Sequence, residues 1–118
     1  MFIDFAHLIT LAHDNTNYRK VIDTFPYAQT VVMHLKEGED IPTEIHPSTT
    51  QIIYVVDGLA RILTPNHKVY LSSSQIDIIP PNTTHYVANA STEPLKLISI
   101  YLPKEHSNDR IDIRQPKQ

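Results

Sequence analysis

Apolar and polar residues alternate in short runs over most of this chain, and turn-forming residues interrupt the runs every six to twelve positions. A period of two is typical of β-strands that bury one face. Clusters of Pro, Gly, Asn, Asp and Ser between the runs mark the strand ends. The pattern therefore predicts an all-β sandwich or barrel. We expect its strands at residues 18–24, 29–36, 43–47, 51–56, 59–64, 67–71, 76–79, 85–90 and 95–102.

The two ends of the chain depart from this alternation. The apolar side chains of the N-terminal segment, residues 1–16, fit neither the helical nor the strand period, so a short helical turn and a strand both stay open. The C-terminal segment, residues 103–118, is polar and flanked by prolines, which predicts a tail or a strap across the surface. A chain of 118 residues can bury one core but not two, so residues 1–118 are expected to form a single domain.

The predicted strand at residues 51–56 is apolar on both faces. If Gln51 points into the domain, the period of two turns Ile52, Tyr54 and Val56 outward. Burying a side chain of this size contributes roughly 1.5–3 kcal/mol, so such a face is not normally left in water. We expect either a homodimer interface on this face or cover by the N-terminal segment.

Composition and charge exclude several function classes. The net charge is −3 and the Lys and Arg residues are scattered, so the sequence lacks the basic stripe that nucleic-acid partners require. The chain has no cysteine, which excludes disulfides, thiolate nucleophiles and sulfur-ligated zinc. Neither a Ser-His-Asp order nor a phosphate-binding glycine loop is present.

The first residues do not resemble a targeting signal. No basic residue precedes the apolar N-terminal positions, and Asp4 and His7 interrupt them. A signal peptide or a membrane span is therefore not expected. We expect a cytoplasmic protein without a membrane partner.

Four side chains with metal-ligating chemistry fall in two separate blocks of the sequence. Glu44 and His46 lie two positions apart, which is the spacing of neighbours on one face of a strand. Gln51 follows after a turn through residues 47–50, and His85 arrives from a different strand after a Pro-Pro-Asn turn. These spacings can bring four donors to one point, so we predict a metal site there.

The first block also matches a known family motif. The first cupin motif is Gly, five residues, His-x-His, three or four residues, Glu, six residues and Gly. This chain has Gly38, five residues, Glu44-x-His46, four residues, Gln51, six residues and Gly58. Glu44 stands where cupins most often have His, and Gln51 stands where they have Glu.

The second block matches the second cupin motif, which is Gly, five residues, Pro-x-Gly, two residues, His, three residues and Asn. Here Ser74, five residues, Pro80-x-Asn82, two residues, His85, three residues and Asn89 keep that spacing. Ser74 and Asn82 replace the two glycines. Asn is the milder replacement because it tolerates the left-handed backbone region better than other non-glycine residues.

The chain resembles small single-domain cupins described as similar to mannose-6-phosphate isomerase, over roughly residues 17–106. The resemblance implies a double-stranded β-helix (jelly-roll) barrel with one divalent metal ion held by Glu44, His46, Gln51 and His85. Two imidazoles, one carboxylate and one amide oxygen suit Mn, Fe, Ni or Zn, and Zn is the least comfortable because it prefers four-coordinate sites.

The resemblance implies a metal-dependent enzyme for a small, oxygen-rich substrate, sugar-like or carboxylate, with Lewis-acid chemistry of the isomerase type. A metal-dependent dioxygenase and a non-catalytic module that binds a small ligand are the alternatives. A barrel that has lost its metal is a third possibility. The catalytic residues stay unknown, because no general base with a partner stands beside the four candidates in the sequence.

Other polar residues are secondary candidates. His106 can reach the barrel mouth if the C-terminal segment folds back, and Tyr101 and Ser99 lie on the last predicted strand. His34 is expected on the solvent side of its strand. Surface positions are expected for the remaining histidines, His7, His13 and His67.

Overall fold

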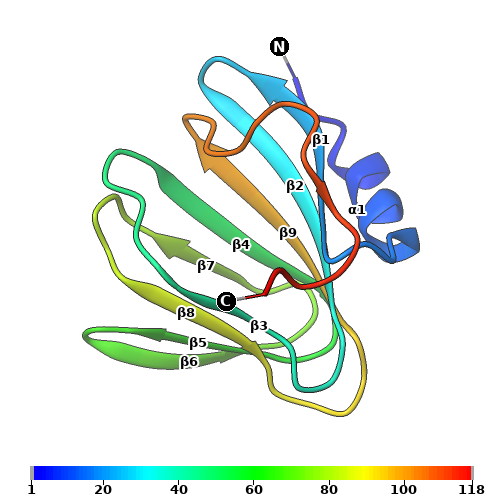
Figure 1. Ribbon diagram of the computed structural model, residues 1–118, viewed down its shortest axis with the longest axis vertical. Helices are drawn as coiled ribbons and strands as arrows, with labels where there is room; N and C mark the ends of the chain where they lie inside the picture. Colours follow the sequence, from blue (N-terminus) through cyan, green and yellow to red (C-terminus); the bar gives the residue numbers. More distant parts are fainter. Residues whose placement is uncertain (1, 118) are drawn as a thin grey trace.

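In the computed structural model, which describes residues 2–117, ten strands form two antiparallel sheets that face each other (Figure 1). The larger sheet has the order β10-β1-β2-β9-β4-β7 and the smaller sheet the order β3-β8-β5-β6. This arrangement confirms the all-β, double-stranded β-helix fold class. The strands are β1 (Arg19–Phe25), β2 (Ala28–Leu35), β3 (Asp40–Glu44), β4 (Thr50–Asp57), β5 (Ala60–Thr64), β6 (His67–Leu71), β7 (Ile76–Ile79), β8 (His85–Asn89), β9 (Leu95–Leu102) and β10 (Ile111–Asp112).

Most strand bounds agree with the sequence prediction to within two residues, but β3 does not. It was expected at residues 43–47 and is found at residues 40–44. Its partner β8 begins at His85, which pairs with Glu44, so no strand is available to pair with the next residues. Pro47 also lacks the N–H that a ladder needs. Glu44 therefore ends the strand, and His46 lies beyond it.

The main core lies between the two sheets and is formed by the alternate, inward positions of their strands. On β4, Ile53 and Val55 are fully buried, as is Leu97 on β9. Gln51 shares their inward face and is 1% exposed. The period of two read from the sequence therefore assigned the two faces of these strands correctly.

A helix, α1 (Phe5–Asp14), precedes the first strand, so a helix and not a strand forms in the N-terminal segment. Asp4 caps it, because the Asp4 carboxylate accepts a hydrogen bond from the His7 backbone N–H at 3.2 Å. Leu8 and Ala12, one turn apart, are buried against the outer face of the larger sheet. This packing stabilises a helix that its own periodicity did not predict. No helix within residues 2–117 is long and apolar enough to cross a lipid bilayer.

The helix covers part of the outward apolar face of β4. Tyr54 and Val56 are half-buried in the cluster that α1 forms with the sheet, and the rings of Phe5 and Tyr54 meet edge to face at 5.0 Å. Cover by the N-terminal segment is therefore confirmed for these side chains. On the neighbouring strand β7, Ile76 and Ile78 remain 53% and 59% exposed. The homodimer interface on the outward face of β4 stays a prediction.

The C-terminal segment is a strap and not a free tail. It leaves β9, crosses the edge of β1, where β10 pairs with it, and ends near β3 (Figure 1, orange to red). A largely buried ion pair between Arg19 and Asp112, 2.6 Å apart, fixes the crossing. Farther along, the Gln115 amide donates to the Asp40 carboxylate at 2.8 Å.

Four turn positions of the two sequence blocks share a left-handed backbone. Gly38 and Gly58 have φ of +81° and +96°, and Ser74 and Asn82, which replace glycines of the family motif, have φ of 71° and 60°. Ser74 and Asn82 therefore adopt the left-handed backbone that glycine favours. A Cβ on Gly58 would lie 2.6 Å from the Pro94 carbonyl oxygen, so this position requires glycine for space as well as for φ.

Candidate metal centre

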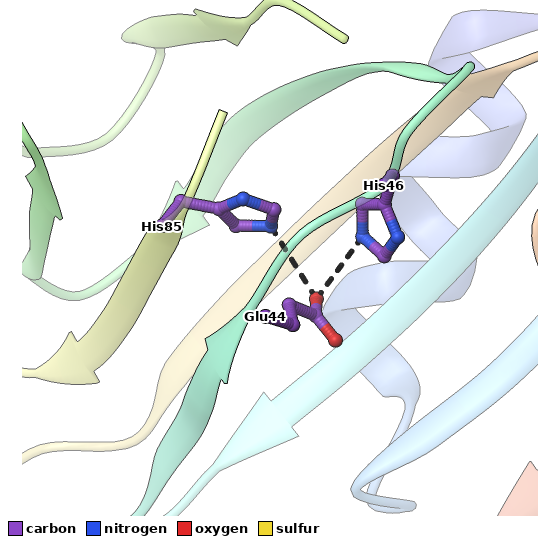
Figure 2. A group of neighbouring side chains, drawn as sticks. All are labelled: Glu44, His46 and His85. Atoms are coloured by element: carbon purple, nitrogen blue, oxygen red, sulfur yellow. Dashed lines mark ion pairs between the residues drawn. The ribbon is translucent and has the colours of Figure 1, made fainter. Parts of the chain in front are cut away.

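Three of the four predicted ligands meet at one point between the sheets (Figure 2). Glu44 is the last residue of β3, His85 is the first residue of β8, and the two are partners in the ladder. The Glu44 Oε1 atom is 3.3 Å from His46 Nε2 and 3.4 Å from His85 Nε2. The three donor atoms lie within 4.8 Å of one another.

His46 reaches this point from the turn after β3 and not from the strand itself. Its backbone carbonyl accepts a hydrogen bond from the Asn82 N–H at 2.8 Å, which links the turns of the two sequence blocks. Its Nδ1 atom is 2.8 Å from Glu105 Oε1 on the C-terminal strap. Contacts from two distant segments therefore set the direction of the His46 ring. Strand alternation, from which the sequence prediction was made, does not set it, because His46 lies beyond the end of β3.

The contacts at Nδ1, on the side of each histidine ring away from the centre, determine which nitrogen carries a proton. His85 Nδ1 is 2.9 Å from the Thr83 carbonyl oxygen, and His46 Nδ1 is 2.8 Å from a carboxylate oxygen of Glu105. Both oxygens accept hydrogen bonds, so each Nδ1 carries a proton, and each ring in its neutral form presents an unprotonated Nε2.

Both Nε2 atoms are buried and lack a hydrogen-bond partner among residues 2–117. They face the Glu44 carboxylate, which is itself an acceptor. When both rings are neutral, these acceptors converge in a buried place, and either a metal ion or a proton between them compensates for the hydration that their lone pairs lose.

The separations of Glu44 from the two histidines fit a divalent metal ion. Two donors at about 2.1 Å from one ion lie about 3.0 to 3.4 Å apart when they occupy neighbouring octahedral or tetrahedral positions. The two measured nitrogen–oxygen distances, 3.3 and 3.4 Å, fall in or near this range. Imidazole and carboxylate donors suit several first-row divalent ions, so the residues do not select one metal.

Gln51, the fourth predicted ligand, is 1% exposed and points between the sheets. Its amide nitrogen donates to the Ser99 hydroxyl at 3.2 Å and to the Tyr101 hydroxyl at 3.3 Å. Its Oε1 atom is buried and lacks a partner within residues 2–117. A free amide oxygen is what a ligand role needs, and the role itself stays a prediction.

The charges of the centre depend on one another. Burial alone would raise the pKa of Glu44, but the contacts with His46 and His85 outweigh burial and hold that pKa well below its usual range. Burial alone would lower the pKa of His46, but the carboxylates of Glu44 and Glu105 outweigh it and raise the pKa. The two carboxylates therefore favour the protonated, positively charged form of the His46 ring in the absence of a metal ion.

The strap folds back and brings His106 near the centre, with the Tyr101 ring between it and His46. The His106 ring packs edge to face on Tyr101 at 5.0 Å, and Tyr101 packs in the same way on His46 at 5.7 Å. Burial, with Arg19 and Arg110 nearby, lowers the pKa of His106 to about 4. The Arg110 guanidinium donates to His106 Nδ1 at 3.1 Å, so the neutral ring carries its proton on the buried Nε2.

Sequence reasoning missed Glu105 and Gln29. Glu105 lies in the polar C-terminal segment, where a carboxylate usually faces water, and nothing local distinguishes it. Gln29 is 0% exposed at an inward position of β2. A polar residue at the start of an otherwise apolar strand could have identified it as a candidate site residue.

The other histidines lie away from the centre, as expected. His34 Nδ1 is 3.2 Å from the Asn15 carbonyl on the outer side of the larger sheet. His7 and His13 are exposed on α1, and His67 is exposed at the start of β6.

A cavity of about 210 Å³ reaches the centre from the side of Glu44. It lies between β1, β3 and the end of the strap, and its lining includes Arg19, Thr43, Glu44 and Lys117. The Glu44 side chain is 29% exposed, whereas the His85 side chain is 1% exposed. Of these two side chains, Glu44 is thus the one more open to a small molecule, and a second cavity of about 460 Å³ has His85 and Thr43 in its lining.

Comparison with known sequences places the chain in a family. The cupin domain family model matches residues 31–101, which is more than half of the chain. An uncharacterised protein of Acanthamoeba polyphaga mimivirus is 43% identical over 107 residues, which cover 87% of this chain and 67% of that protein. YrkC of Bacillus subtilis is 33% identical over 98 residues, 78% of this chain and 53% of YrkC. The chain thus spans between half and two thirds of these relatives.

A third relative is an enzyme. Mannose-1-phosphate guanylyltransferase RfbM of Salmonella typhimurium is 33% identical over 66 residues, which cover 56% of this chain and 14% of RfbM. The match is to a small part of that protein.

Solved structures share the fold. A crystal structure of a Bacillus halodurans protein has a TM-score of 0.87 at 26% identity, covering 96% of this chain and 88% of that one. KdgF from Halomonas sp. has a TM-score of 0.69 at 23% identity, with coverage of 74% and 80%, which shows the fold alone. With a cupin domain matched over most of the barrel, and both motifs placed around one buried donor cluster, this chain belongs to the cupin family.

Proposed function

We propose that the protein is a metal-dependent enzyme that acts on a small, oxygen-rich substrate, sugar-like or carboxylate, by Lewis-acid chemistry of the isomerase type. The observation that carries this proposal is the pair of buried Nε2 lone pairs, on His46 and His85, that face the Glu44 carboxylate without a donor between them. A divalent ion there would polarise substrate oxygen atoms and make an adjacent C–H or O–H group more acidic.

The chain's own residues would hold and surround such an ion. Glu44, His46 and His85 would bind it, and Gln51 would add its free amide oxygen. The buried apolar walls between the sheets exclude water from the far side of the centre, which strengthens every electrostatic interaction there.

The cavity beside Glu44 supports an oxygen-rich and negatively charged substrate. Lys117 places positive charge on its lining, to which Thr43 also contributes, while the charge of Arg19 is paired with Asp112. A carboxylate or phosphate group would be attracted to Lys117 while its hydroxyl groups approach the centre. The relative RfbM carries a sugar phosphate in its name, which agrees with this class.

Two proton-bearing groups lie near the centre and could serve a substrate there. Tyr101 is fully buried, and burial raises its pKa, so it keeps its proton at neutral pH. His106 is neutral with its proton on Nε2. Either group can donate a hydrogen bond to a substrate oxygen, which is the help that a reaction near a Lewis acid needs.

A non-catalytic module that binds a small ligand is the second candidate. Glu105, the carboxylate next to His46, uses one oxygen on His46 and the other on the Thr49 hydroxyl, so it is not free to act as a general base. Such a site can hold a ligand without transforming it.

Metal analysis of the protein purified without added metal tests the proposal. We expect close to one Mn, Ni or Zn ion per chain, together with conversion of a small hydroxy-aldehyde or sugar phosphate to its isomer. Iron with consumption of O2 would favour the dioxygenase. A bound metal with ligand binding but without turnover would favour the binding module. Protein that stays metal-free after supplementation would contradict all three.

A further inference from the structure

The C-terminal strap is attached to the barrel at the place where it passes the metal centre. Gln29, fully buried at the start of β2, accepts hydrogen bonds through Oε1 from the backbone N–H groups of Glu105, at 3.1 Å, and His106, at 2.9 Å. Its amide nitrogen donates to the His106 carbonyl at 2.8 Å. One side chain thus binds the backbone of two successive strap residues.

This attachment leaves the Glu105 side chain free to act on the centre, and both of its oxygens are used there. Oε1 is 2.8 Å from His46 Nδ1, and Oε2 accepts from the Thr49 hydroxyl at 3.3 Å. The side chain is 30% exposed, so burial does not explain its orientation. The Thr49 contact sets the tilt of the carboxylate, and the carboxylate sets the direction of the His46 ring.

We propose that Glu105 is a positioning residue of the metal centre, which holds His46 with Nδ1 protonated and Nε2 directed at the ion, and that Gln29 holds Glu105 in place. This inference rests on the proposed metal binding. A carboxylate that accepts from the outer nitrogen of a ligand histidine fixes its tautomer and raises its basicity, and its loss typically costs ten- to a hundredfold in metal affinity. The strap is then part of the centre although it supplies no ligand.

If Glu105 served only to hold the strap on the barrel, removing its carboxylate would release the strap. The strap is held without this side chain, through the Gln29 contacts to the backbone and through the pairing of β10 with β1. Removing the carboxylate should therefore leave the strap docked, and any change in metal affinity would come from His46.

The test measures the affinity of the full chain for zinc or nickel by competition with a chromogenic chelator. Glu105→Ala should weaken binding by ten- to a hundredfold, and Glu105→Gln should weaken it less, because its amide oxygen still accepts from Nδ1 but carries no charge. Asp109→Asn is the matched control, since it removes one charge from an exposed position of the same strap, and it should stay within twofold.

Nitrogen NMR of the zinc-loaded protein with labelled histidine gives a readout that a structural role would not change. His46 should show a protonated Nδ1 in the unaltered protein, and that signal should broaden or shift in Glu105→Ala while the His85 signal stays. The melting temperature of the metal-free variants, compared with the Asp109→Asn control, shows that they are folded.

The possible failures are distinguishable. If the unaltered protein binds neither zinc nor nickel, the metal site and this inference both fall. If it binds metal and Glu105→Ala binds within threefold of it with an unchanged His46 signal, the positioning role alone is wrong. A loss in Glu105→Ala that Glu105→Gln does not partly restore would also contradict it.

Discussion

Two regions of the molecule serve the same imidazole and differ in almost every other respect. The first is the pair of motif blocks, residues 38–58 and 74–89, which carry Glu44, His46 and His85 at family spacing. The second is the strap, residues 103–117, which has no such motif and still reaches the outer nitrogen of His46. The motif blocks supply the candidate donors, and the strap contacts the outer nitrogen of one of them, His46.

The difference shows which residues of a site can be recognised from the sequence and which cannot. Side chains that bind one metal ion must meet at bonding distance, so their residue types and spacing are constrained. They therefore form a recognisable sequence motif. A residue that orients a donor needs only one acceptor at the right place, and any segment that folds back can bring it. The predictions below separate these two contributions.

The largest effect is expected from removing a donor. His46→Ala should abolish most metal binding, with an affinity loss of at least a hundredfold, because it deletes one of the converging nitrogens. Competition with a chelator measures it. His67→Ala, an exposed histidine on β6, is the matched control and should bind as the unaltered protein does. An affinity of His46→Ala within threefold of the parent would show that the donor assignment is wrong.

The next effect concerns the ion pair between Arg19 and Asp112, which anchors the strap to β1. Asp112→Ala should lower the free energy of unfolding by about 3 kcal/mol, because it leaves the Arg19 guanidinium buried without its partner. Urea denaturation of the metal-free protein measures the loss. Asp109→Ala, on the exposed side of the strap, should change the free energy by less than about 0.5 kcal/mol. Equal effects of the two variants would show that the anchor does not stabilise the fold.

Acid titration checks the same anchor independently. Burial alone would raise the pKa of Asp112, but Arg19 and Arg110 outweigh burial and lower it. A carboxyl with a lowered folded-state pKa stabilises the protein above its unfolded value of about 3.9, and this contribution is lost as the pH falls through the folded value. Below about pH 4, unfolding free energy should therefore decline less steeply in Asp112→Ala than in the parent. Parallel curves would contradict the ion pair.

The smallest effect lies within the motif blocks. Ser74→Gly should stabilise the protein by about 0.5–1 kcal/mol, because serine at φ of 71° is strained and glycine is not. Asn82→Gly, at φ of 60°, should gain less, because Asn tolerates this region. Thermal unfolding of both variants gives the comparison. A larger gain at Asn82 would show that backbone strain does not decide these positions.

The sequence alone determined the features that depend on local pattern. The period of two assigned the inward face of Gln51 and the outward face of Tyr54, and the motif spacing identified the Glu44, His46 and His85 group that the structure brings together. These features follow from the alternation of side chains along a strand and from turn chemistry, which act over a few residues.

Only the tertiary structure decided the rest. The N-terminal segment is a helix because Leu8 and Ala12 pack on a sheet formed far along the chain, and β3 stops at Glu44 because its partner strand begins at His85. Glu105 contacts His46 across a separation of 59 residues, and Gln29, which lies 76 residues before Glu105 in the chain, holds its backbone there. Contacts of this kind depend on which segments the closed barrel brings side by side. They join residues that are far apart in the sequence, so no periodic pattern along the chain predicts them.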